Sequence, residues 1–117
     1  MPVSDGFRRF TLEQLARVAP GLRSKGMFGG VGIYSGDLFF ALIDDDTLYL
    51  KVDDATRPAF EARGLGPFRP GGPAGEVMQY YEVPVDVLED AEELRPWVAD
   101  AIGVAGRAKR KGGRRRR

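Results

Sequence analysis

The sequence predicts an α+β fold in which a mainly antiparallel five-stranded sheet is flanked by helices, in the chain order α-β-β-β-α-β-β-α. Two observations predict it. Apolar residues recur at helical spacing near both ends of residues 1–104, and between these ends they alternate or run together as they do in strands. Glycine, proline and aspartate separate the strand-like segments at short intervals, which is typical of antiparallel neighbours.

The first helix is expected over residues 11–19. Thr11 and Gln14 have the spacing of a capping box, in which each side chain accepts a hydrogen bond from the backbone amide of the other residue. The apolar residues that follow share one helical face, and Pro20-Gly21 predicts the end of the helix.

Three strands are expected next, over residues 27–35, 37–43 and 47–52. Gly36 and the run Asp44-Asp45-Asp46 separate them, and both breaks have turn chemistry. The middle segment is continuously apolar, as expected of a central strand, so the three form an antiparallel meander.

The second half of the sheet is expected after another helix. That helix begins at Asp53 or Asp54 and ends at about Arg63, before Gly64. A short strand over 66–69, a loop over 70–75 and a last strand over 76–83 then complete the sheet.

The last helix is expected to follow Asp90, which with Glu93 makes a second helix-start pattern. Its apolar stripe consists of Leu94, Trp97, Val98, Ala101 and Ile102. Because proline lacks an amide donor and clashes with the preceding turn, Pro96 predicts a kink or a fresh helix start.

Charge divides the chain into two parts. Residues 1–104 hold ten Lys and Arg against seventeen Asp and Glu, a net charge of −7, whereas residues 105–117 carry +8 without an acid. A block of like charges with little apolar surface is typical of disorder, so residues 1–104 are expected to be one domain and 105–117 a disordered basic tail. The tail either contacts nucleic acid, solubilises the chain or folds back on the acidic body. Its cations are Arg107, Lys109, Arg110, Lys111, Arg114, Arg115, Arg116 and Arg117.

Composition excludes several kinds of site. The chain has no cysteine and no histidine, which excludes disulfides, thiolate zinc sites and Cys or His nucleophiles. We therefore expect no catalytic residue, no metal and no cofactor. The start of the chain lacks the pattern of a signal peptide, and no apolar run is long enough to span a membrane, so a cytoplasmic protein is expected.

Four further patterns have a functional and a structural interpretation. The run from Gly26 to Gly32 lacks the phosphate-loop spacing and enters a strand, which favours a bend where another backbone approaches closely. Asp44 to Asp46 are a hairpin turn in preference to a cation site. The pairs Phe39-Phe40 and Tyr80-Tyr81 are expected in the core or a dimer surface, because an acidic body repels the phosphates of an RNA.

The fourth pattern is a candidate ligand or partner groove. Lys51 and Arg57, together with Tyr49 and Tyr80, are placed to line an anion-binding surface. The alternative is that Lys51 and Tyr49 face solvent while Arg57 pairs with a neighbouring acid.

The strings that fill these elements resemble one known family. They are Met27 to Tyr34 (MFGGVGIY), Phe39 to Leu42 (FFAL), Leu48 to Lys51 (LYLK), Thr56 to Phe60 (TRPAF), Pro67-Phe68, Met78 to Pro84 (MQYYEVP) and Leu88 to Trp97. In this order and spacing, over roughly residues 12–104, the chain resembles the N-terminal domain of the TfoX/Sxy competence-regulator family.

The resemblance implies an α+β domain that often forms a dimer and has no catalytic residue set. It implies a non-enzymatic regulatory or protein-interaction domain that acts with a protein partner such as a transcription regulator. The alternative function is a nucleic-acid-associated protein that binds DNA or RNA electrostatically through the basic tail. We expect a homodimer in the first case, and no membrane partner in either.

Overall fold

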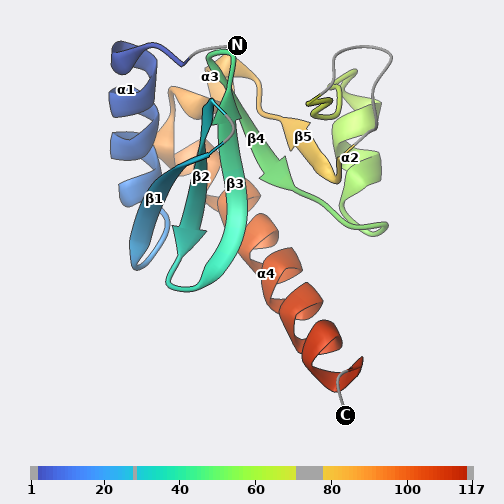
Figure 1. The fold of residues 1–117 in the computed structure, drawn as a ribbon. Helices are drawn as coiled ribbons and strands as arrows, with labels where there is room; N and C mark the ends of the chain where they lie inside the picture. The colour runs from blue at the N-terminus through green and yellow to red at the C-terminus, as the bar shows by residue number, and fades with distance from the viewer. Residues whose placement is uncertain (1–2, 28, 71–77, 116–117) are drawn as a thin grey trace.

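The computed structural model describes residues 3–27, 29–70 and 78–115. Its centre is one antiparallel sheet in which the strands lie side by side in chain order (Figure 1). The strands are β1 (Leu22–Met27), β2 (Gly30–Ser35), β3 (Leu38–Asp44), β4 (Thr47–Lys51) and β5 (Tyr80–Glu82). The helices are α1 (Asp5–Ala16), α2 (Arg57–Ala62), α3 (Val85–Leu88) and α4 (Ala91–Arg115). The predicted α+β class, with five antiparallel strands, is confirmed.

The helices pack on one face of the sheet, which we call the core face. Alternation along the strands sends Val31, Ile33, Ala41, Ile43, Leu48 and Leu50 into the core, where all are buried. A β-bulge lies between Ile33 and Tyr34, where β3 has one extra residue. The bulge places Phe40 in the core and Phe39 outside it.

The expected start of the first helix is wrong. Helix α1 begins at Asp5, and the Ser4 hydroxyl caps it by accepting a hydrogen bond from the Phe7 amide at 3.2 Å. Thr11 is fully buried inside the helix, and the Gln14 amide group donates to the Leu88 carbonyl at 2.9 Å. The residues of the supposed capping box therefore connect the helix to the core.

The strands also differ from the prediction: one was not expected, and two expected ones differ. Strand β1 was not expected as a separate strand, because its interior residues are exposed and show no apolar alternation. The expected strand over 66–69 is replaced by a single bridge between Pro67 and Tyr81, although Gly66 and Phe68 still bond to the backbone of β5. Strand β5 is shorter than the predicted strand over 76–83. Residues 71–77, which hold most of the predicted loop and the start of that strand, lie outside the described part of the chain.

The turns follow the predicted chemistry. Asp45 and Asp46 both have φ of 51°, a left-handed conformation that suits the hairpin between β3 and β4, so the interpretation as a turn is confirmed. Gly64 has φ of 75° just after α2, as a C-terminal stop requires. Helix α2 itself is shorter than expected and is preceded by a turn that begins at Asp53.

Helix α4 is continuous through Pro96, so of the two predicted alternatives the fresh helix start is wrong. Pro96 lies exposed in the second turn, where water can satisfy the carbonyl that loses its partner. Leu94 and Val98 on either side are fully buried and hold the helix to the sheet. The predicted cap at Asp90 is confirmed, since its carboxylate accepts from the Glu92 and Glu93 amides.

Residues 105–115 correct the prediction of a disordered tail, because they extend α4. Ala105 is buried in the core, and the helix continues past the sheet, so that its C-terminal end projects from the body (Figure 1). Arg116 and Arg117 lie outside the described residues, and Lys111, Arg114 and Arg115 are described only by their backbone. No helix within the described ranges has the length and apolar character that crossing a membrane requires.

The glycine-rich run is explained by close packing, as its structural interpretation predicted. A Cβ atom at Gly30 would lie 2.4 Å from the Ile43 carbonyl oxygen, and one at Gly32 would lie 2.4 Å from the terminal methyl of Met27. The first contact is with backbone, which cannot move aside without disturbing the β2–β3 ladder. Gly30 is therefore fixed by the approach of β3.

We predict that Gly30→Ala lowers the free energy of unfolding by about 1–3 kcal/mol, as overpacking does in well-packed sites. Gly26→Ala is the matched control, because its Cβ atom would meet nothing closer than the Gly30 carbonyl oxygen at 4.0 Å. It should leave stability unchanged or slightly raised. Urea unfolding of the three proteins checks this, and an equal effect of the two substitutions would contradict it.

Candidate functional site

The face of the sheet opposite the helices, which we call the outer face, carries three of the four tyrosines of the chain, Tyr34, Tyr49 and Tyr80. Its register follows from the antiparallel pairs Arg23↔Tyr34 and Lys51↔Tyr80 and from Met27, which lies over Gly32. The outer face consists of Arg23, Lys25, Met27, Gly30, Gly32, Tyr34, Phe39, Leu42, Asp44, Thr47, Tyr49, Lys51, Tyr80 and Glu82.

Aromatic rings gather at one end of the outer face. The rings of Tyr34 and Phe39 are stacked with centroids 5.0 Å apart, and Phe39 lies 5.6 Å from the ring of Tyr80. The Arg23 guanidinium lies 5.9 Å from the Tyr34 centroid, and the Lys51 ammonium lies 5.0 Å from that of Tyr80.

This arrangement differs from a base-stacking platform. Stacking on a nucleobase requires ring faces that point outward, whereas Tyr34 has Phe39 and Arg23 against its ring and Tyr80 has Lys51. Of the two pairs expected in the core or a dimer surface, Phe40 and Tyr81 are core residues. Contact with another apolar surface suits this cluster better than contact with bases.

Charges on the outer face differ along the strands. Arg23 and Lys51 lie at the end of the face that holds the stacked rings, and Asp44 lies at the other end. Lys25 and Glu82 lie in the row between these ends. Burial, together with the charges of Glu82, Asp44 and Asp45, raises the pKa of Tyr49. Burial lowers the pKa of Lys51 and raises the pKa of Tyr80 to about 12.

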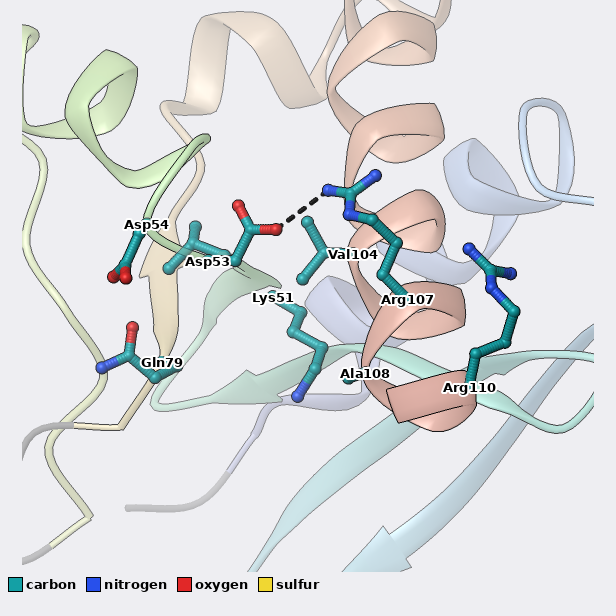
Figure 2. A pocket seen from close by; sticks show the side chains of 9 residues that line it. Lys51, Asp53, Asp54, Gln79, Val104, Arg107, Ala108 and Arg110 are labelled. Atoms are coloured by element: carbon teal, nitrogen blue, oxygen red, sulfur yellow. Dashed lines mark hydrogen bonds and ion pairs between the residues drawn. The ribbon is translucent and has the colours of Figure 1, made fainter. Parts of the chain in front are cut away.

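A cleft of about 630 Å³ adjoins the outer face where β4 ends beside the C-terminal half of α4 (Figure 2). Its lining residues are Lys51, Val52, Asp53, Asp54, Gln79, Val104, Arg107, Ala108 and Arg110. The cleft therefore joins residues of the predicted groove to residues of the predicted tail. Its apolar wall comes from Val52, Val104 and Ala108.

One ion pair closes the cleft on the side of α2. The Arg107 guanidinium donates to the Asp53 carboxylate at 2.9 Å, as Figure 2 shows. The other oxygen of Asp53 accepts from the Ala55 and Thr56 amides, and the Thr56 hydroxyl accepts from the Asp53 amide. The hydrogen bond from Arg107 holds the pKa of Asp53 below its usual value.

A second ion pair fixes α4 at the turn between β2 and β3. The Lys109 ammonium pairs with the Asp37 carboxylate, and this pairing lowers the pKa of Asp37. With the Arg107–Asp53 pair, it agrees with the alternative that the basic tail folds back on the acidic body. The sequence does not indicate which residues form these pairs, because they join residues 54 and 72 positions apart.

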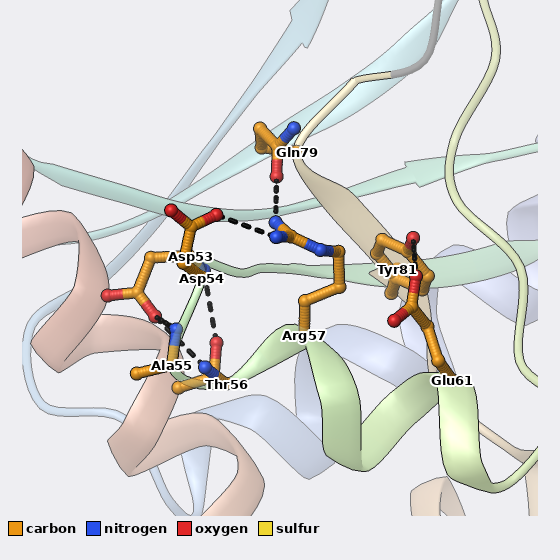
Figure 3. Close-up of polar contacts among 8 residues, drawn as sticks. All are labelled: Asp53, Asp54, Ala55, Thr56, Arg57, Glu61, Gln79 and Tyr81. Carbon is orange, nitrogen blue, oxygen red and sulfur yellow. Dashed lines mark hydrogen bonds and ion pairs between the residues drawn. The ribbon is translucent and has the colours of Figure 1, made fainter.

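The predicted groove is assembled only in part. Lys51 and Tyr80 are in contact, and Tyr49 lies on the same face of β4 as Lys51. Arg57 turns away from them, donating to the Asp54 carboxylate at 2.6 Å and to the Gln79 side chain at 2.9 Å (Figure 3). The expectation that Arg57 pairs with a neighbouring acid is therefore confirmed.

The remaining polar contacts of this region support the fold. The Tyr81 hydroxyl donates to the Glu61 carboxylate at 3.0 Å, which fixes α2 against β5 (Figure 3). In the part of the chain that the structure describes, no three acidic, cysteine or histidine residues are grouped as metal ligands would be.

The chain is similar to one protein family. The family model described as the TfoX N-terminal domain matches residues 13–105, which include all five strands and α4 as far as Ala105. A comparison with curated proteins gives no match.

We predict that burial of Tyr80 makes the protein lose stability at alkaline pH. An unfolded tyrosine ionises near pH 10, but Tyr80 in the folded chain ionises near pH 12, so between these values the folded state binds more protons than the unfolded state. The free energy of unfolding should therefore fall as the pH rises, by about 1.4 kcal/mol at pH 11. Tyr80→Phe should lack this loss.

Denaturant unfolding from about pH 9 to about pH 11 measures the difference, with the substituted protein as the reference for all other titrating groups. Parallel curves for the natural chain and Tyr80→Phe would contradict the prediction.

Proposed function

This chain belongs to the TfoX N-terminal domain family, and on that premise we propose that it is a non-enzymatic regulatory domain that acts by binding protein. The proposed role is that of a transcription co-regulator of the competence-regulator kind, working as a homodimer. Support comes from the family, and one structural observation carries the argument: the outer face with its aromatic cluster.

The outer face has the composition of a protein interface. Tyrosine and arginine are enriched where proteins bind, because they combine apolar area with a polar group at a small cost in conformational entropy. Tyr34, Phe39 and Tyr49 are half-buried in the isolated chain, so each still has apolar surface to lose. Phe68 already packs on Tyr49, with ring centroids 5.1 Å apart.

A second copy of this chain fits the outer face. A two-fold interface must be complementary to itself, so each feature needs its opposite elsewhere on the same surface. Arg23 and Lys51 at one end and Asp44 at the other contribute to this: a copy with its strands reversed brings Arg23 and Lys51 toward the end of the partner's face that holds Asp44. The aromatic cluster then packs between the two sheets.

We predict that Phe39→Glu prevents formation of the dimer, because it places a charge among the stacked rings. Val85→Glu is the matched control: Val85 is the most exposed large apolar side chain described, at 62%, and lies on α3 away from the outer face. Light scattering coupled to size exclusion should give a dimer for the natural chain and the control, and a monomer for Phe39→Glu. A natural chain that stays monomeric at high concentration would refute the homodimer.

The regulatory role has its own test in the source organism. Deleting the gene should change the transcript levels of a defined set of other genes, and the natural chain should restore them. We expect Val85→Glu to restore them and Phe39→Glu to fail, at equal protein levels. Unchanged transcripts in the deletion strain would count against regulation, whatever the oligomeric state.

A further inference from the structure

The C-terminal half of α4 contains the densest run of like charges in the sequence. Arg107, Lys109 and Arg110 are exposed on it, and no acidic residue follows Asp100 in the sequence. Five more cations follow Arg110. The proposed dimer through the outer face leaves this surface unexplained.

The helix extends to Arg115, so the backbone positions of the cations from Arg107 to Arg115 follow one another along its axis. At 1.5 Å per residue, the backbone from Arg107 to Arg115 spans about 12 Å of helix axis. Duplex DNA carries one negative charge per about 1.7 Å of its own axis, so several phosphates lie within that length. Along the helix axis, Arg115 lies about 9 Å beyond Lys109, which pairs with Asp37. This distance is close to one Debye length at physiological salt.

Two acidic residues of the body already form ion pairs with the first basic residues of this helix half. Asp53 accepts from Arg107, and Asp37 pairs with Lys109. Both pairs are open to solvent, with side-chain exposures of 53% for Arg107 and 58% for Lys109. Exposed ion pairs contribute little stability, so a phosphate that reaches the same cations competes with the carboxylates on nearly equal terms.

We propose that the C-terminal half of α4 binds the sugar–phosphate backbone of double-stranded nucleic acid, and that Asp37 and Asp53 weaken this binding by pairing with Lys109 and Arg107. Binding is independent of sequence and sensitive to salt, because it depends on phosphate neutralisation. The two acids set the affinity, since each must give up its cation when a phosphate binds.

The test uses the full chain and fluorescence anisotropy with a short labelled duplex DNA, and with the matching duplex RNA, from about 50 to 200 mM salt. Asp37→Asn and Asp53→Asn should each tighten binding about two- to fivefold relative to Glu13→Gln, which changes the charge equally on α1. Asparagine keeps the shape of the side chain and can still cap the turn at Asp53.

A second set of variants tests the cations themselves. Arg107→Ala with Lys109→Ala should weaken binding and reduce the slope of log affinity against log salt by about 2. Arg8→Ala with Arg9→Ala removes the same charge from α1 and should change the slope much less. Exchanging the two residue types, Arg107→Lys with Lys109→Arg, should retain binding, because the contact is electrostatic.

Three results would overturn the proposal. The first is absence of binding to either duplex at about 50 mM salt. The second is equal affinity of Asp37→Asn, Asp53→Asn and Glu13→Gln. The third is tighter binding to vesicles of mixed phosphatidylserine and phosphatidylcholine than to both duplexes, which would assign the helix to a membrane surface. Circular dichroism of every variant confirms that changes in affinity do not come from unfolding.

Discussion

The packing of α4 across β3 and β4 is the constraint on which the rest of the structure depends. Leu94, Val98, Ala101 and Ala105 form one buried stripe of this helix, and each turn of the stripe meets the core face of the sheet. Because the stripe continues to Ala105, the direction of the helix is fixed up to the point where its charged residues begin. The positions of the basic residues are therefore a consequence of core packing.

When one face of a sheet is buried against helices, the other face is covered only by the side chains of the sheet itself. Here the β-bulge at β3 separates neighbouring phenylalanines, so that Phe40 fills the core while Phe39 stands among the outer rings. Gly32 provides the space in which Met27 and Phe39 approach each other. The same strands thus build the hydrophobic core and a partly buried aromatic surface suited to a partner. The chain contains no cysteine or histidine that could act as a nucleophile.

The sequence predicted what depends on local periodicity and missed what depends on distant partners. The class, the meander, the turn at Asp45 and the cap at Asp90 were predictable because each is encoded within a few residues. Strand β1 was missed because an exposed edge strand has no apolar alternation. The helical state of residues 105–115 was missed because the buried contact of Ala105 and the ion pairs of α4 join segments far apart in the chain.

The ion pairs also explain how a stretch of like charges remains helical. Gly106 costs about 1 kcal/mol relative to alanine in a helix interior, and repulsion between neighbouring cations adds to that cost. Each exposed pair returns at most about 1 kcal/mol, so the helix beyond Ala105 is only marginally stable by itself. A phosphate that replaces Asp37 or Asp53 supplies the same neutralisation. When a phosphate replaces the carboxylate of Asp37 or Asp53, Lys109 or Arg107 stays neutralised and the helix is preserved. The same helix can therefore belong both to the fold and to a binding surface.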